Sequence, residues 1–270
     1  MKTAAKTKDG IGRYRQFEHG AIYWTKQTGS HAVRGAIYAK WQEMGAETSL
    51  LGYPTSDEEI APDYGKHGDG RISHFQNGII SWTEQTGAHE IHDAILRKWM
   101  SMGLGLSYLG YPITDEQDAP GGGRISHFQH GWIYWSEPTG AHEVHGAIVW
   151  KWQNLQAKQH IFLGYPTSDE EVTPQGDRLS YFQYGSIYWS EETGPHEVHG
   201  AINAVWEDLQ AKHISLGVPI TDEQDAPAGG RISHFKNGTI TLTQDGRISI
   251  SWVQAGCGWT QILCNTSPNT

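Results

Sequence analysis

Apolar and polar residues alternate along short stretches of the chain, and glycine-containing turns separate these stretches. Residues 71–75 and 79–82 have the alternation of two strands, and Asn77-Gly78 between them is typical of a tight hairpin turn in which glycine adopts a positive φ. After Thr86-Gly87 the period changes, because the apolar residues between Ala94 and Met102 recur at helical spacing. The pattern predicts a β-hairpin followed by a short amphipathic helix.

This unit recurs along the whole chain. Each copy opens with an arginine, has an aromatic residue four positions later and a glycine three positions after that. The arginines are Arg13, Arg71, Arg124, Arg178 and Arg231, at successive spacings of 58, 53, 54 and 53 residues. We therefore expect an α+β repeat in a single domain, 1–270. Its expected modules are residues 10–69, 70–122, 123–175, 176–229 and a partial copy at 230–270.

Comparison of the copies predicts which strand residues are buried. One face of the second strand is apolar in every copy, which indicates a core face. Its residues are Ile22, Ile80, Ile133, Ile187 and Ile240, with Trp24, Trp82, Trp135, Trp189 and Leu242. The positions between them vary in kind, as outward positions do, so Tyr23, Tyr134 and Tyr188 are expected to be exposed. The helical tryptophans are expected in the core: Trp41, Trp99, Trp152 and Trp206.

Three interleaved motifs connect the repeats to a known family. The motif LGYP begins at Leu51, Leu109 and Leu163, with the variant LGVP at Leu216, and it alternates with TGxHxVxGAI and FxxGxIYW. Over roughly residues 10–242 the chain resembles the LGFP repeat family. The resemblance implies five modules in a propeller-like pentagonal ring. The fifth copy departs from the pattern at residues 245–249, so ring closure is expected to use the tail or the N-terminal strand.

The resemblance also implies a function and a location. LGFP repeats occur in secreted or cell-envelope proteins, notably as the C-terminal arm of corynebacterial mycoloyltransferases. They are also attached to other hydrolases. The implied function is attachment to cell-wall or surface polysaccharide by a multivalent, lectin-like module without catalytic activity.

Acidic pairs and histidines are the candidate binding groups. The pairs are Asp57-Glu58, Asp115-Glu116, Asp169-Glu170 and Asp222-Glu223. They suit sugar hydroxyls or a calcium ion, or alternatively they cap turns and pair with the recurring arginine. His31, His89, His142 and His196 are expected to stabilise a turn or bond a sugar. A zinc-protease site is not expected, because that motif places its two histidines four residues apart and His89 and His92 are three apart.

The predicted carbohydrate site combines these groups with the tyrosines, whose rings would stack on sugar faces. Its residues are Tyr23, His31, Asp57, His89, Asp115, Tyr134, His142, Asp169, Tyr188, His196 and Asp222. No unique nucleophile or poised acid pair departs from the repeat, so no catalytic residue and no required cofactor are predicted. A protein-interaction scaffold and a glycan hydrolase are the alternatives.

The composition of the chain argues against several classes of binding partner. The formal net charge of −10 argues against nucleic acid and anionic membrane surfaces. No apolar run reaches the roughly 18 residues of a membrane span, and the first ten residues lack the apolar centre of a signal peptide. A monomer is expected, either inside the cell or secreted or envelope-associated after removal of a leader. Cys257 and Cys264 form a disulfide only in an oxidising compartment.

Overall fold

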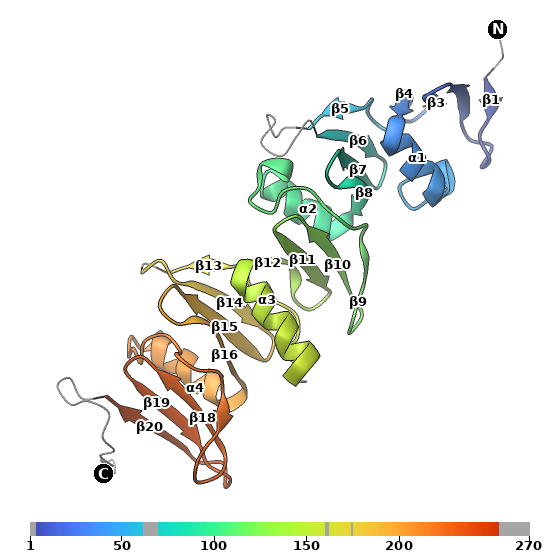
Figure 1. Ribbon diagram of the computed structural model, residues 1–270. Coiled ribbons are helices and arrows are strands. Elements are labelled where there is room, and N and C mark those ends of the chain that lie inside the picture. The colour runs from blue at the N-terminus through green and yellow to red at the C-terminus, as the bar shows by residue number, and fades with distance from the viewer. Residues whose placement is uncertain (1–3, 62–69, 160–161, 174, 254–270) are drawn as a thin grey trace. The chain divides into compact units, whose positions relative to one another are not determined.

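A computed structural model of the chain describes residues 4–61, 70–159, 162–173 and 175–253 (Figure 1). The cysteine pair considered above lies outside these residues. The chain divides into two compact units, Met1–Gly146 and Ala147–Thr270, and each is described by itself. Together they contain five repeat modules, each built on a four-stranded antiparallel sheet.

The first unit contains three sheets. The strands of the first two are β1 (Ala5–Lys6), β2 (Arg13–Phe17), β3 (Gly20–Thr25), β4 (Gly29–Arg34), β5 (Glu59–Ile60), β6 (Arg71–Phe75), β7 (Gly78–Thr83) and β8 (Gly87–His92). The third sheet comprises β9 (Gln117–Ala119), β10 (Gly123–Phe128), β11 (Gly131–Ser136) and β12 (Gly140–His145). The helices are α1 (Gly35–Met44) and α2 (Asp93–Ser101), with 3₁₀ turns η1 (Ala46–Thr48) and η2 (Leu104–Leu106).

The second unit repeats this plan. All but the first residue of helix α3 (Gly146–Asn154) belongs to it, and a π-helical turn η3 (Leu155–Gln159) follows. Its two sheets are formed by β13 (Glu171–Val172), β14 (Arg178–Phe182), β15 (Gly185–Ser190), β16 (Gly194–His199), β17 (Gln224–Asp225), β18 (Arg231–Phe235), β19 (Gly238–Leu242) and β20 (Ile248–Trp252). Helix α4 (Gly200–Ala211) lies between these sheets in the sequence.

Each sheet is a simple meander and is larger than the predicted hairpin. The predicted hairpin is present, since β6 pairs with β7 from Arg71 opposite Trp82 to Phe75 opposite Gly78. The segment that was expected to be a turn into the helix is a third long strand, β8, paired along all of β7. A short strand, β5, adds the fourth and begins at Glu59, before the expected start of the second module at residue 70.

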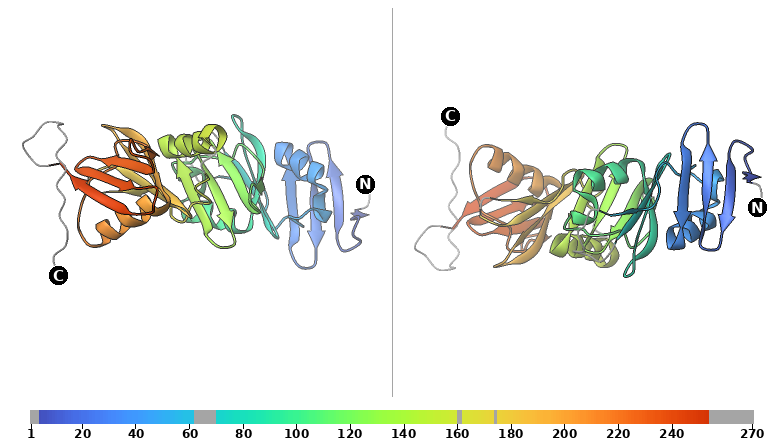
Figure 2. Two further views of the ribbon diagram at one scale, coloured as in Figure 1. Left: turned by 90° about the horizontal axis from the view of Figure 1, so that it is seen from below. Right: turned by 90° about the horizontal axis from the view of Figure 1, so that it is seen from above.

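Helices α1, α2 and α4 each pack on two sheets, their own and the next along the chain. In the first unit α1 contacts β3 and β4 of its own sheet and β7 and β8 of the following sheet. The Trp41 ring lies 4.6 Å from Tyr23 on one side and 5.3 Å from Phe75 on the other. Trp206 of α4 lies likewise between Tyr188, at 4.5 Å, and Phe235, at 5.6 Å. Helices and sheets therefore alternate as layers within each unit (Figure 2).

This layering corrects the prediction that the tyrosines are exposed. Tyr23, Tyr134 and Tyr188 retain only 4%, 9% and 5% of their exposed surface. The face opposite the isoleucines is covered as well, because a helix packs on it at Tyr23 and at Tyr188. Tyr134→Ala is therefore a core substitution, and the variation between copies at these positions reflects different packing instead of exposure.

On the predicted core face the isoleucines are buried in four sheets and exposed in the first, whereas Trp82, Trp135, Trp189 and Leu242 on the same face are only half-buried. Ile80, Ile133, Ile187 and Ile240 are fully buried. Ile22 and Trp24 of the first sheet are 40% and 44% exposed, and Phe17 beside them is 49% exposed. In the other four sheets a preceding helix covers this face, and no helix precedes β2 in the described chain. The four helical tryptophans are buried as predicted.

The hairpin glycine is needed for space and not for a positive φ. Gly78 is absent from the residues that adopt positive φ, contrary to the prediction for Asn77-Gly78. A Cβ added there would lie 2.7 Å from the carbonyl oxygen of Ile91 and 2.7 Å from a methyl group of Leu51. The glycine thus lets strand β8 and the LGYP segment approach the hairpin closely.

Candidate functional site

The LGYP segment fastens the end of each helix to the hairpin tip of the following sheet. The backbone N–H of Tyr53 donates to Gln76 Oε1 at 2.9 Å, and the backbone N–H of Gln76 donates to the Tyr53 carbonyl at 3.0 Å. Trp41 Nε1 donates to the Gly52 carbonyl at 3.2 Å. Gly52 has φ +69, and an added Cβ would lie 2.5 Å from Gln76 Oε1. The motif is therefore a structural clamp, and its glycine permits the close contact.

The candidate histidines hold the threonine–glycine turn. His89 Nε2 lies 2.9 Å from the Thr86 carbonyl, and His31, His142 and His196 contact the equivalent threonine carbonyls. On its other side His89 Nδ1 lies 3.3 Å from Asp115 Oδ1. The structure thus contains the turn-stabilising arrangement that the sequence left as one of two alternatives.

The candidate aspartates join successive modules. Asp115 follows the second LGYP segment and accepts from the backbone N–H of Glu90 in β8 at 3.2 Å. It also pairs with Lys40 of α1, so one carboxylate joins the loop before the third sheet to strand β8 of the second sheet and to the helix that follows the first sheet. Burial alone would raise the pKa of Asp115, but hydrogen bonds with His89 and Lys40 outweigh it and lower the pKa to about 2. This carboxylate stays ionised and serves as a fastener.

Asp222 repeats the arrangement in the second unit. It pairs with Lys151 of α3 and lies 3.4 Å from His196 Nδ1 of β16. The pKa of Asp222 is also lowered to about 2, because the bonds with His196 and Lys151 outweigh burial. Asp57 accepts from the backbone N–H of Ala32 at 2.8 Å. Asp169 lies in the equivalent loop before β13, where its carbonyl accepts from the Ser168 hydroxyl at 2.8 Å.

In three of the acidic pairs the glutamate, and not the aspartate, binds the recurring arginine, as Glu116, Glu170 and Glu223 do. Glu116 has a side chain that is 3% exposed and accepts from Arg124 Nε at 3.0 Å. His92 Nε2 approaches the same carboxylate at 3.4 Å, and His92 Nδ1 lies 2.9 Å from Glu90. The hydrogen bond with Glu90 raises the pKa of His92, and burial raises the pKa of Glu116.

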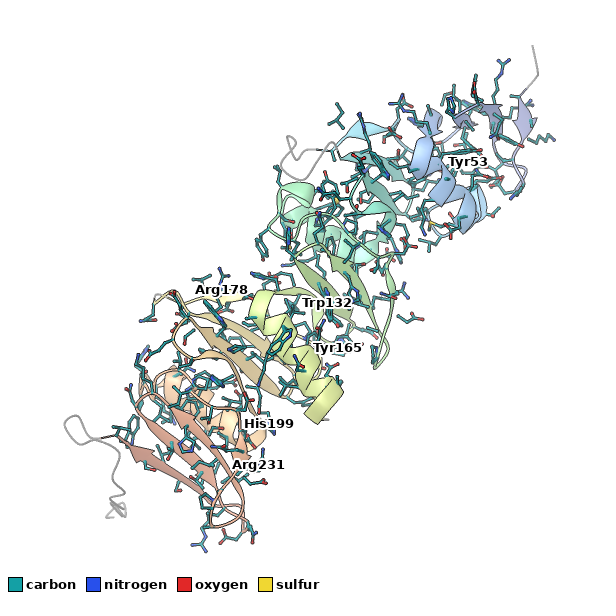
Figure 3. All side chains as sticks on the ribbon, in the orientation of Figure 1. Tyr53, Trp132, Tyr165, Arg178, His199 and Arg231 are labelled. Carbon is teal, nitrogen blue, oxygen red and sulfur yellow. The ribbon has the colours of Figure 1, made fainter. Side chains whose placement is uncertain are left out.

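The same cluster occurs in the second unit. Figure 3 shows His199 and Arg231 near one another, and both contact Glu223, at 3.4 Å and 3.0 Å. His199 Nδ1 lies 2.7 Å from Glu197, and this bond raises the pKa of His199. The clusters bring buried carboxylates together, but arginine and histidine already occupy them. Among the described residues, no group of three or more histidines, cysteines or carboxylates is arranged to hold a metal ion.

The predicted site residues do not form one binding surface. The structure brings three of the four predicted histidine–aspartate pairs together, with Nδ1 to Oδ1 distances of 3.7 Å for His31–Asp57, 3.3 Å for His89–Asp115 and 3.4 Å for His196–Asp222. The three tyrosines are buried, and Tyr23 and Tyr188 pack on the tryptophans of α1 and α4. None of them is available to stack on a ligand.

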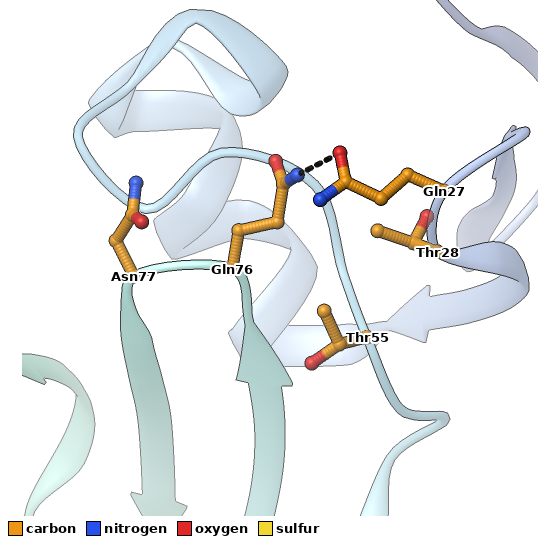
Figure 4. A pocket seen from close by; sticks show the side chains of 5 residues that line it. All are labelled: Gln27, Thr28, Thr55, Gln76 and Asn77. Atoms are coloured by element: carbon orange, nitrogen blue, oxygen red, sulfur yellow. Dashed lines mark hydrogen bonds between the residues drawn. The ribbon is translucent and has the colours of Figure 1, made fainter.

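A polar pocket lies between the first two modules, at residues that the sequence did not single out. It has a volume of about 400 Å³, within the roughly 300–1,000 Å³ of ligand sites, and is lined by Gln27, Thr28, Thr55, Gln76 and Asn77 (Figure 4). These residues come from the turn after β3, the loop after LGYP and the tip of the second hairpin. All five side chains are amides or hydroxyls and none is charged.

The pocket was missed because its lining comes from three segments in two modules. One signal was present in the sequence. Gln27 and Gln85 stand in phase before their threonine–glycine turns, and Gln76 and Gln129 stand in phase after the strand phenylalanine. The structure joins these positions in pairs, since Gln76 Nε2 lies 3.5 Å from Gln27 Oε1 and Gln129 Nε2 lies 3.3 Å from Gln85 Oε1.

Comparison of the sequence with known families recognises five LGFP repeats, at residues 2–49, 51–105, 109–159, 163–213 and 216–255. The chain belongs to the LGFP repeat family. Each LGFP repeat after the first begins at the leucine of its LGYP or LGVP segment. One family repeat therefore comprises this segment, the sheet that follows it and the next helix where one is present. No curated protein is significantly similar to the chain.

The chain has remote likenesses among solved structures. A streptogramin B lyase has 8% identity and a TM-score of 0.16, with 94% of this chain and 68% of that chain covered. The TCP10 domain of Danio rerio CPAP has 7% identity and a TM-score of 0.23, with 93% and 83% covered. These scores carry no argument about fold or function. Within the described residues, no helix has the length and apolarity needed to span a bilayer.

Proposed function

We propose that this LGFP protein is a non-catalytic, multivalent carbohydrate-binding module that attaches to cell-wall or surface polysaccharide. The observation that carries the proposal is the pocket of amides and hydroxyls at a module junction, together with the recurrence of its amide pair at the next junction. Amides and hydroxyls both donate and accept hydrogen bonds, as sugar hydroxyls require. Repetition of the module supplies several such sites on one chain.

Multivalency is central to the proposal. A single shallow polar site binds weakly, but linked sites rebind a polymer at high effective concentration and raise avidity by roughly 10²- to 10⁴-fold. The net charge of −10 disfavours polyanions and favours neutral polymers. The protein acts as a monomer in a secreted or envelope-associated setting, as the family resemblance implies, and needs no bound ion.

A glycan array followed by a turnover assay tests this function. Immobilised polysaccharides should retain the protein, whereas their free monosaccharides should compete only at far higher concentration, because one site is weak. Reducing ends measured after long incubation of the retained polymer with protein should not increase. Release of reducing ends would establish a hydrolase instead.

A protein-interaction scaffold is the second candidate, and one observation favours it. Phe17, Ile22 and Trp24 form an exposed apolar face on the first sheet, and such faces often contact other proteins. If no polysaccharide retained the protein, a protein-interaction scaffold would replace the carbohydrate-binding module as the favoured function.

We also propose that the five modules close into a pentagonal ring, as the resemblance implies. The same apolar face supports this arrangement. In every other sheet the equivalent residues Phe75, Phe128, Phe182 and Phe235 are buried beside the tryptophan of a preceding helix. A closed ring would leave no sheet with such a face uncovered.

A further inference from the structure

The pocket position changes its chemistry from one junction to another. At the first and second junctions two glutamine side chains face each other, Gln27 with Gln76 and Gln85 with Gln129. At the fourth junction the equivalent residues are Glu192 and Lys236, whose Oε2 and Nζ atoms lie 2.8 Å apart. The copy of Gln27 in the third module is Pro138, which has no side-chain amide. The junctions are therefore not chemically equivalent.

The amide pairs retain hydrogen-bonding capacity for a ligand. The Gln76–Gln27 contact of 3.5 Å is at the outer limit of a hydrogen bond, and a glutamine amide offers two donors and an acceptor with two lone pairs. Thr55 makes no side-chain hydrogen bond among the described residues, and its hydroxyl also lines the pocket. A hydroxyl-rich ligand can satisfy these groups without displacing a strong internal bond.

The ion pair offers less to an uncharged ligand. Glu192 and Lys236 are 72% and 58% exposed, and they already satisfy one another. A neutral sugar seated there would have to separate the charges or remove water from them, and desolvation of a charge costs much more than desolvation of an amide. The same fold thus provides two open positions and one that is closed to neutral ligands.

Building on the proposed carbohydrate function, we propose that the two amide-paired junctions, Gln27–Gln76 and Gln85–Gln129, are the subsites for a neutral glycan. The Glu192–Lys236 junction does not bind it. The chain then holds a neutral polymer at two points instead of one at every module boundary.

Affinity electrophoresis in gels cast with neutral polymers tests this assignment. The probes are soluble glucans, mannans, galactans and arabinans, with polygalacturonate as the anionic comparison. The double variant Gln27→Ala/Gln85→Ala removes one amide from each subsite at exposed positions, where substitutions barely change stability. Its affinity for the retarding neutral polymer should fall at least about tenfold. Glu192→Ala, at the equivalent position of the fourth junction, is the matched control and should not weaken binding.

A gain of binding provides the converse test. The double variant Glu192→Gln/Lys236→Gln recreates the amide pair of the second junction, where Ile113 occupies the position of Ile220. Its affinity for the same polymer should rise severalfold above that of the unaltered protein, because a third binding subsite has been added.

The outcomes separate the subsite assignment from the broader function. Retardation that Gln27→Ala/Gln85→Ala leaves unchanged overturns the assignment while the carbohydrate function stands. Stronger retardation by polygalacturonate than by every neutral polymer overturns the neutral ligand class. Unchanged affinity of Glu192→Gln/Lys236→Gln shows that the ion pair is not what closes the fourth junction. Absence of retardation by every polymer removes both the assignment and the proposed function.

Discussion

Individual residues in this protein mostly serve the joints between modules. Asp115, in the loop before the third sheet, contacts helix α1 and strand β8, and His92 lies between the buried carboxylates of Glu90 and Glu116. Buried charges of this kind persist only where they are paired. The polar residues that look most reactive in the sequence are therefore occupied in holding the repeat together.

The histidines between buried glutamates should make stability depend on pH. Hydrogen bonds with Glu90 and Glu197 raise the pKa values of His92 and His199 in the folded state. The stabilisation is fully present below the unfolded pKa of about 6.5 and is lost as pH rises through the raised folded pKa. Urea unfolding should therefore show a larger fall in unfolding free energy between pH 6 and pH 8 for the unaltered protein than for His92→Gln/His199→Gln.

His19→Gln is the control for this experiment, because its side chain is 84% exposed. That variant should keep the pH dependence of the unaltered protein. Equal slopes in all three proteins would show that the histidine–glutamate bonds do not influence folding.

Single residues also show where inference from the sequence succeeds and where it stops. The period of 53–58 residues and the burial of Trp99 follow directly from the recurring pattern. Tyr23 was misassigned because its copies differ in kind, yet Ser81 at the same position is 1% exposed and Tyr23 only 4%. Variation between copies here records different packing against a helix, which a pattern of single residues does not reveal. The pocket was missed because it forms only after folding brings two modules together.

At the scale of elements, the helix is the shared component. Trp152 of α3 is 2% exposed and lies 4.9 Å from Phe182 of the following sheet. Trp150, on the same helix, is 60% exposed. The two residues have the same side chain and lie on one helix, yet only one joins the core.

This pair allows a matched test of the layered packing. Trp152→Ala should lower the free energy of unfolding by about 3–5 kcal/mol, because it leaves a cavity between helix and sheet. Trp150→Ala should change it by less than about 0.5 kcal/mol. Chemical denaturation monitored by circular dichroism measures both, and comparable losses in the two variants would contradict the assignment of faces.

The elements were predictable to the extent that their periods are local. The hairpin and the helix were found because alternation and helical spacing occur within about ten residues. Strand β8 was not predicted because it contains Glu90, a residue type that is usually exposed. Glu90 is nevertheless buried, where it pairs with His92. The short strand β5 has two residues and no periodic signal.

At the scale of the whole molecule, the open face of the first sheet distinguishes a closed ring from an open array. Trp24 is 44% exposed on that face, whereas its neighbours in the repeat have helices over them. Solution accessibility of this one side chain therefore reports on the proposed ring.

Hydroxyl-radical footprinting with mass spectrometry measures that accessibility. A closed ring should protect Trp24 to the level of half-buried Trp82, its equivalent in the second sheet, and an open array should leave its reactivity near that of Trp150, which is 60% exposed. Both references lie in the same chain and are labelled in the same sample. Strong labelling of Trp24 would count against the ring.

The sharing of α1, α2 and α4 by two sheets each has a mechanical consequence for a protein anchored to a polymer. Tension along the chain cannot open one sheet without also stripping the helix that the next sheet depends on. Unfolding under load should then proceed module by module, each releasing about 53 residues, or about 180 Å of extended chain at roughly 3.4 Å per residue. A tether of this kind unfolds in steps, and each step absorbs mechanical energy before the last attachment to the polymer is broken.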